Sequence, residues 1–252
     1  MKVPVILFLS FLISFGAAVQ VATAKQNPIP QVSSIPAAQA AFKEGVLRLG
    51  SHHYRQAISF FSMAIASDKN IAAAYSNRAV CYSQLEQWEP ASKDINQALA
   101  IDPRFAGAYH LRADLHFQNH ELAKSIEDMS KACQLEPNYA THFYSRGKLY
   151  EIAEKNDKAE QDYRRCLEIK DNGTNAAFRL GNLEMKLGRF AEAAAHFTRY
   201  IHQHHPEDLE ASYLHRALCY EKLGKMDLAQ KDRTLARSLT ENGWGEIFRP
   251  QK

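Results

Sequence analysis

Small side chains recur at fixed places along this chain, with a period of 34 residues over most of its length. Within each period, the spacing of apolar positions predicts two helices of about a dozen residues joined by a short turn. Such a period is typical of an array of one supersecondary unit, in which each unit buries its apolar face on its neighbours. The pattern predicts six units, which open near Ala38, Ala72, Ala106, Ala140, Thr174 and Glu210. The small residue of the predicted first helix is Gly45, Ala79, Ala113, Gly147, Gly181 or Ala217.

Large rings and prolines complete the repeat. An aromatic residue stands early in four of the first helices, at Tyr75, Tyr109, Phe143 and Tyr213. Prolines, which cannot continue a helix, follow two of the second helices. With these positions the chain resembles the tetratricopeptide repeat family over residues 38–239. The resemblance implies an all-α fold, a right-handed α-solenoid of six helix-turn-helix hairpins, whose first helices line a concave groove that can hold an extended peptide or a short helix.

Four first helices carry an arginine where the family has an apolar residue, and an aspartate follows each arginine sixteen residues later. The pairs are Arg78 with Asp94, Arg112 with Asp128, Arg146 with Asp162, and Arg216 with Asp232. The first and fifth units lack both partners. Because the two residues are present or absent together in all six units, we predict an ion pair between the two helices of one hairpin. The alternative, that these arginines bind an acidic ligand, is disfavoured because each already has a partner.

Two other places depart from the family pattern. Tyr200 stands where an alanine is expected, next to two additional residues in the stretch 203–206. We therefore expect irregular packing between the fifth and sixth units. Residues 240–252 contain Trp244 and Phe248, which predicts a tail that folds back over the exposed apolar end of the array.

The resemblance also implies which side chains face the groove. On this sequence those places hold a mixture of aromatic anchors and hydrogen-bonding groups, which suits a protein or peptide partner. The predicted contact residues are Phe42, Ser76, Asn77, His110, Asp114, Phe117, Tyr144, Lys148, Phe178, Asn182, Met185 and Lys222. The alternative is that these side chains only pack between helices. Of the residue set with which chaperone-binding relatives hold a carboxylate, only Asn77 is present, so recognition of a chaperone tail is disfavoured.

The first residues predict export from the cytoplasm. Lys2 is followed by an apolar run over residues 5–15 and by small residues up to Ala24, the pattern of a secretory signal peptide over residues 1–24. Cleavage after Ala24 would give a periplasmic or secreted protein. The alternative is that residues 1–24 persist as a transmembrane anchor, which is the only contact with a membrane that we expect. Residues 25–37 contain three prolines and predict an extended linker.

Composition and motifs exclude several functions. The formal net charge is only +3, and no block of lysine and arginine supports binding to nucleic acid. No glycine-rich phosphate loop and no Gly-x-Ser-x-Gly turn occur, so we expect neither an enzyme nor a cofactor. The even number of cysteines favours disulfides in an exported protein, but the register places Cys81 and Cys219 four repeats apart. A bond between Cys133 and Cys166 stays open.

The sequence therefore predicts an exported, non-enzymatic scaffold that binds a protein segment in its groove, with a bacterial envelope assembly or maintenance factor as the preferred setting. A membrane-anchored assembly factor is one alternative. Another is a metal-binding or metal-regulated adhesion protein, because His116 and His120 lie four residues apart on one predicted helix. We predict no metal site, since no set of carboxylates at ligand spacing accompanies these histidines.

Overall fold

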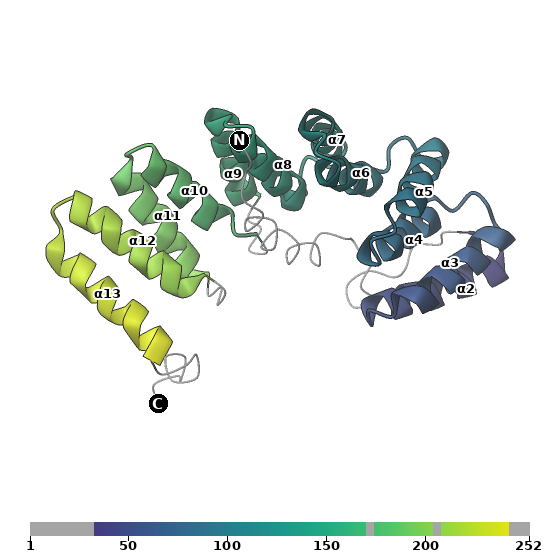
Figure 1. The fold of residues 1–252 in the computed structure, drawn as a ribbon, viewed down its shortest axis with the longest axis horizontal. Coiled ribbons are helices and arrows are strands. Elements are labelled where there is room, and N and C mark those ends of the chain that lie inside the picture. The colour runs from purple at the N-terminus through teal and green to yellow at the C-terminus, as the bar shows by residue number, and fades with distance from the viewer. Residues whose placement is uncertain (1–32, 170–173, 204–207, 242–252) are drawn as a thin grey trace. The chain divides into compact units, whose positions relative to one another are not determined.

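The computed structural model describes residues 33–169, 174–203 and 208–241. These residues form twelve helices and no strand, which confirms the predicted all-α fold of helical hairpins (Figure 1). The helices belong to two compact units, one up to Pro137 and one from Asn138 onward. The predicted signal peptide, most of the predicted linker and residues 242–252 of the predicted tail lie outside the described ranges. In those ranges, no helix has both the length and the apolar character needed to cross a membrane.

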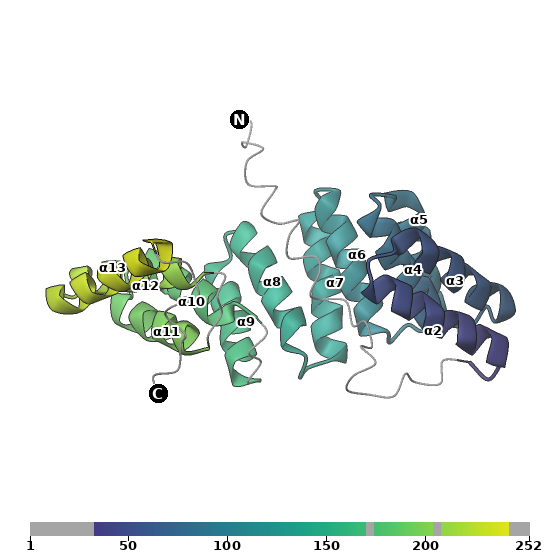
Figure 2. The ribbon, with the colours of Figure 1, turned by 90° about the horizontal axis from the view of Figure 1, so that it is seen from below.

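The first unit contains three hairpins, each made of two consecutive helices joined by a short turn (Figures 1 and 2). Hairpin 1 is α2 (Pro36–Gly50) with α3 (Tyr54–Ser67), hairpin 2 is α4 (Ala72–Gln84) with α5 (Trp88–Ile101), and hairpin 3 is α6 (Ala106–Gln118) with α7 (Leu122–Leu135). Helix α2 begins two residues before the predicted boundary of the linker, because proline is tolerated in the first turn of a helix. The segment before it is also attached, since the Ser33 hydroxyl donates to Asp68 Oδ2 at 2.6 Å.

The second unit contains the other three hairpins. Hairpin 4 is α8 (Ala140–Ile152) with α9 (Asn156–Glu168), hairpin 5 is α10 (Ala176–Lys186) with α11 (Phe190–His202), and hairpin 6 is α12 (Leu209–Lys222) with α13 (Met226–Glu241). Helix α13 continues two residues beyond the predicted end of the array at 239. The packed interior of each unit lies between the helices of its hairpins and between consecutive hairpins.

The turn inside every hairpin ends the first helix in the same way. The second residue after the helix has a positive φ, and the next N–H donates to a carbonyl five residues earlier, for example from Gln87 to Tyr82 at 2.9 Å. This is the Schellman arrangement, which satisfies carbonyls at a helix end. Only hairpins 5 and 6 use glycine for the left-handed residue. The six residues are His52, Glu86, His120, Glu154, Gly188 and Gly224.

In hairpins 1 to 5 a small residue of the first helix is matched with a large buried residue of the second helix. Where the second helix presents an aromatic ring, the facing residue of the first helix is glycine, as in Gly45 with Phe61. A Cβ on Gly45 would lie 2.6 Å from the Phe61 ring. Where the second helix presents an aliphatic chain, as at Ile95, the facing residue is Ala79. Glycine at these places leaves room for the aromatic ring of the facing helix, and the repeated small residues set the distance between the two helices.

Tyr200 is part of the packed interior of the second unit. Its side chain is fully buried, its ring lies 5.4 Å from the ring of Phe178, and its hydroxyl donates to Asp208 Oδ2 at 3.4 Å. The large ring therefore fills space between hairpins 5 and 6 and does not disrupt their contact. The ring finds apolar neighbours and its hydroxyl finds an acceptor, while irregular packing between the fifth and sixth units stays a prediction.

Candidate binding surface

The structure brings each of the four arginines together with the aspartate sixteen residues later. Nε and Nη2 of the guanidinium donate to the two carboxylate oxygens at 2.7 to 2.8 Å in all four hairpins. This bidentate geometry is the strongest form of the pair. The hydrogen bonds that Arg78 donates to Asp94 also raise the pKa of Arg78, so this guanidinium stays charged. Each pair joins the two helices of one hairpin.

In hairpins 2 and 6 the third nitrogen of the guanidinium reaches the preceding hairpin. Arg78 Nη1 donates to Ser62 Oγ at 2.8 Å, and Arg216 Nη1 donates to Thr198 Oγ1 at 2.9 Å. One side chain therefore connects three helices. The sequence contained a signal for this contact, because small hydrogen-bonding residues recur one helix before the arginines, but the predicted pairing within each hairpin did not use it.

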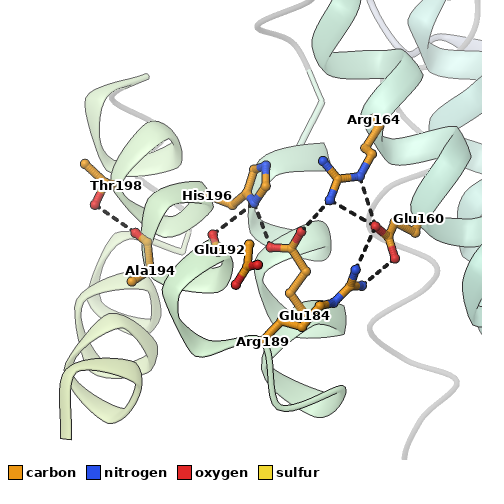
Figure 3. Close-up of polar contacts among 8 residues, drawn as sticks. All are labelled: Glu160, Arg164, Glu184, Arg189, Glu192, Ala194, His196 and Thr198. Carbon is orange, nitrogen blue, oxygen red and sulfur yellow. Dashed lines mark hydrogen bonds and ion pairs between the residues drawn. The ribbon is translucent and has the colours of Figure 1, made fainter. Parts of the chain in front are cut away.

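In hairpin 5 the polar link between helices is made by a carboxylate of the first helix and not by an arginine (Figure 3). Leu180 and His196 stand where hairpins 2, 3, 4 and 6 have arginine and aspartate. The carboxylate now lies on the first helix, at Glu184, and it is fully buried. It contacts His196 Nδ1 at 2.7 Å on its own second helix and accepts from Arg164 Nη2 at 2.9 Å on the second helix of hairpin 4.

A second bridge lies beside this link. Glu160 accepts hydrogen bonds from both Arg189 and Arg164, including a contact of 3.1 Å from Arg189 Nη1. The hydrogen bonds from Arg189 lower the pKa of the Glu160 carboxyl. The two bridges join α9 to hairpin 5 without any of the residues that the repeat predicted. Neither bridge recurs in the other hairpins that the structure describes, so comparing the repeats could not reveal them.

Three of the predicted groove residues lie in the interior. Phe42, Ser76 and His110 expose only 3, 6 and 5% of their surface. The Phe42 ring packs against Phe61 at a centroid distance of 5.7 Å. These side chains have almost no surface to offer a ligand, so the prediction is corrected for them. The resemblance located the helix face but could not determine how deeply each place on it is buried.

The other predicted residues of the first unit are partly exposed. Asn77, Asp114 and Phe117 are half-buried on α4 and α6. Asp114 Oδ2 lies 3.7 Å from Nε2 of the buried His110, one helical turn away. These three side chains provide one amide, one carboxylate and one ring on the first helices of this unit.

In the second unit, α8 and α10 bring together two predicted residues and two that the prediction missed. Lys148 Nζ lies 5.1 Å from the centroid of the half-buried Tyr144 ring. Arg179 Nη1 lies 3.7 Å from Glu151 Oε2, and Glu151 also accepts a hydrogen bond from the Tyr163 hydroxyl. Burial raises the pKa values of Tyr144 and Tyr163, so both phenols stay protonated. We call the surface formed by Tyr144, Lys148, Glu151 and Arg179 the α8–α10 cluster.

Four further predicted residues divide between interior and surface. Phe178 packs against Phe197 at 5.8 Å and is stacked on His215 at 5.7 Å, so its ring mainly joins hairpins 5 and 6. Met185 also packs against the interior. Asn182 is half-buried and Lys222 is exposed. The groove prediction therefore mixes packing residues with exposed ones.

Family models for the tetratricopeptide repeat match residues 72–105, 106–139, 143–172 and 178–237, which together make up more than half of the chain. The chain is a tetratricopeptide repeat protein. Its fold and its family make it a protein–protein interaction scaffold. The observed hairpin boundaries follow the same register as these matches.

Solved tetratricopeptide repeat structures resemble the chain as folds. The structure of Pseudomonas aeruginosa pilF has a TM-score of 0.71 at 19% identity and covers 82% of this chain and 93% of its own. PilW, described as a widely conserved type IV pilus biogenesis factor, has a TM-score of 0.67 at 20% identity, with 84% and 97% covered. YrrB, described as a TPR protein with an unusual peptide-binding site, has a TM-score of 0.60 at 21% identity, with 73% and 93% covered.

A curated relative is also similar over a short stretch of the repeats. The mitochondrial import receptor subunit TOM34 of Homo sapiens is 31% identical over 75 residues, and the orthologue of Pongo abelii matches equally. The match covers 30% of this chain and 24% of the relative, so the chain spans about a quarter of that protein.

The cysteines of this tetratricopeptide repeat protein lie in its interior, and His116 has a carboxylate partner. All four cysteine thiols are buried, and burial raises the pKa of Cys81 to about 12 and that of Cys219 to about 11. His116 Nδ1 contacts Glu121 Oε2 at 2.5 Å. Within the described ranges, no three histidine, cysteine, aspartate or glutamate residues gather at a distance suited to a metal ion. The sequence also has three histidines close together, at residues 202, 204 and 205, of which the last two lie outside those ranges.

Proposed function

We propose that this protein is a non-enzymatic scaffold that binds a peptide or protein segment, and that the α8–α10 cluster is the centre of the binding surface. The observation that carries the proposal is the composition of this cluster. It combines a phenol, an ammonium, a carboxylate and a guanidinium, all partly exposed on the first helices of hairpins 4 and 5. A packing surface needs no such mixture, whereas an aromatic anchor flanked by charges is typical of a recognition surface.

The cluster suits a segment with a ring or an aliphatic side chain next to charged residues. The Tyr144 ring offers an apolar face, and Lys148 and Arg179 add two positive charges against the single carboxylate of Glu151. A partner with an acidic residue close to its apolar anchor therefore fits best. The description of YrrB as a protein with an unusual peptide-binding site agrees with such a use of the fold.

A pull-down with the whole chain tests this proposal. We compare the partners retained by the parent, by Lys148→Ala with Tyr144→Phe, and by a control, Lys93→Ala, which removes an exposed lysine of α5. Lys148→Ala with Tyr144→Phe should lose partners that the control keeps, because the two changes remove a charge and a hydroxyl without emptying the interior. If the cluster variant keeps every partner of the parent, the proposal is wrong.

We further propose that the protein acts outside the cytoplasm, in the cell envelope. The apolar run at residues 5–15 and the small residues before Ala24 support an exported protein. The description of PilW as a pilus biogenesis factor is compatible with an envelope assembly role, although the likeness concerns the fold. The intact mass of the protein recovered from cells is the test. Loss of residues 1–24 supports export with cleavage, and retention of them in a membrane fraction favours the anchored alternative.

A further inference from the structure

A polar pocket of about 360 Å³ lies between hairpins 2 and 3 of the first unit and shares no residue with the α8–α10 cluster. It falls within the usual range of ligand pockets, about 300–1,000 Å³. The wall from hairpin 2 comes from α5, and the wall from hairpin 3 comes from α6 and the turn after it. The pocket is lined by Trp88, Ser92, Asn96, Arg112, Leu115, His116, Asn119 and Glu121. None of them belongs to the predicted groove.

The repeat explains why the pocket exists. At the junction between hairpins 1 and 2, the corresponding places hold large apolar side chains. Ile58 corresponds to Ser92, Tyr82 to His116, and Leu85 to Asn119, each 34 residues later. Ile58 and Tyr82 pack against the core of the first unit. At these three places the junction between hairpins 2 and 3 therefore has polar side chains where the preceding junction has larger, more apolar ones, and these polar groups line the pocket.

The missing tyrosine leaves an arginine incompletely packed. In hairpins 2, 4 and 6 the guanidinium lies between two aromatic rings, for example 5.6 Å from Tyr75 and 5.9 Å from Tyr82 for Arg78. Hairpins 4 and 6 repeat this arrangement with the second ring at 5.7 and 5.8 Å. Arg112 has the first ring, Tyr109, at 5.4 Å, but His116 stands in the place of the second.

His116 does not substitute for the absent ring, because its imidazole is held elsewhere. Its Nδ1 contacts Glu121 Oε2 at 2.5 Å, and its Nε2 lies 3.6 Å from Asp128 Oδ2. The Arg112 side chain is accordingly 31% exposed, whereas the other three arginines are 14 to 19% exposed. Its Nη1 has only a long contact of 3.5 Å to Asn96 Oδ1.

We propose that this pocket binds an aromatic side chain of a partner protein, with tyrosine as the preferred residue. The incoming ring takes the place that Tyr82, Tyr150 and Tyr220 occupy in the other hairpins and stacks on the Arg112 guanidinium, which is an attractive contact of the cation–π kind. Trp88, 37% exposed at the start of α5, provides an apolar wall for the ring. The site is independent of the proposed α8–α10 surface.

The rim of the pocket favours a phenol over a phenyl ring. The side chains of Ser92 and Asn119 make no hydrogen bond within the described part of the chain, and Asn96 has only the long contact with Arg112. A hydroxyl that enters between them can both donate and accept. The acidic groups nearby are already engaged, Asp128 by Arg112 and Glu121 by His116 and Lys124. A neutral ring with one hydroxyl therefore matches the pocket better than a charged side chain.

The test uses N-acetyl-tyrosinamide as the probe and Trp88 as the reporter. The full chain has two tryptophans, so Trp244→Phe leaves Trp88 alone. We expect saturable quenching of Trp88 by the probe, binding of N-acetyl-phenylalaninamide weaker by about fivefold for the lost hydrogen bond, and no saturation with N-acetyl-leucinamide. If the leucine compound binds as well as the tyrosine compound, the proposal is wrong.

Two variants at one residue separate a filled pocket from a damaged one. His116→Tyr supplies the ring from within the chain, as in hairpins 2, 4 and 6, and should weaken binding of the probe at least about tenfold. His116→Ala loses the same hydrogen bonds but leaves the pocket open, so it should bind the probe at least about tenfold more tightly than His116→Tyr. Equal binding of the probe by the folded His116→Tyr and His116→Ala variants would overturn the proposal.

Discussion

The pairing of glycine with an aromatic ring across a hairpin can be tested at Gly45. In the middle of a helix, alanine is more favourable than glycine by about 1 kcal/mol, because glycine loses more backbone entropy on folding. From helix propensity alone, Gly45→Ala in α2 should therefore stabilise the protein. The structure predicts the opposite sign. A Cβ on this residue would lie 2.6 and 2.7 Å from two carbons of the Phe61 ring.

The size of the effect follows from the space around Phe61. Carbon atoms rest at about 3.5–4.0 Å, so the ring must move by about 1 Å to admit the new methyl group. Phe61 is fully buried and packs on Phe42, so the movement displaces other side chains. Overpacking of a core costs typically 1–3 kcal/mol. With a contact this short we expect about 3 kcal/mol, which leaves a net loss of about 2 kcal/mol after the gain in helix propensity.

The assay is urea unfolding of four proteins, followed by circular dichroism. They are the parent, Gly45→Ala, Phe61→Ile and the double variant, which recreates the pair formed by Ala79 and Ile95 in hairpin 2. In the isoleucine background, Gly45→Ala should gain about 1 kcal/mol, so its effect changes sign between the two backgrounds. If Gly45→Ala stabilises the parent, or has one sign in both backgrounds, packing against the ring is not the reason for glycine.

Three further predictions follow from the contacts described above. Asp94→Ala should cost about 3 kcal/mol in urea unfolding, because it leaves the partly buried Arg78 without its bidentate partner, whereas replacing both by apolar residues should cost much less. Glu86→Gly should raise the free energy of unfolding by about 1 kcal/mol, because the φ of Glu86 is 57° and glycine adopts that conformation without strain; a loss would show that the exposed glutamate side chain contributes more than its backbone strain. The pKa of Glu160 is lowered by Arg189 from its ordinary value of 4.5, so its stabilising effect is complete above that pH and is lost as the pH falls through the lower, folded value. Glu160→Gln should accordingly be less stable than the parent at pH 7 and should approach it on acidification; parallel curves of unfolding free energy against pH would contradict this.

Most of the fold was predictable because successive hairpins repeat the same pattern of residues. The period, the small residues and the coupled arginine and aspartate are present several times, so each copy confirms the others. The candidate surface was only partly predictable. Phe42 and Phe117 occupy groove places of the repeat, yet one is buried and the other half-buried. How deeply a side chain is buried depends on its neighbours in that particular hairpin, and the position of a residue in the repeat does not determine those neighbours. Arg179 and Glu151 were missed for the same reason, since their contact occurs in one place only.

Hairpin 5 shows what the repeat conserves when its residues change. In hairpin 2, the positive charge lies on the first helix, and acceptors lie on both neighbouring second helices, at Ser62 and Asp94. In hairpin 5, the negative charge of Glu184 lies on the first helix, and donors lie on both neighbouring second helices. The donor and acceptor roles are exchanged, but in both hairpins one charged side chain of the first helix joins the three corresponding helices. A charge buried here must be matched from both sides, so the residues of a junction have to change together. The residues that must match one another are therefore those of the junction between two consecutive hairpins, and they come from both sides of the boundary of the 34-residue repeat.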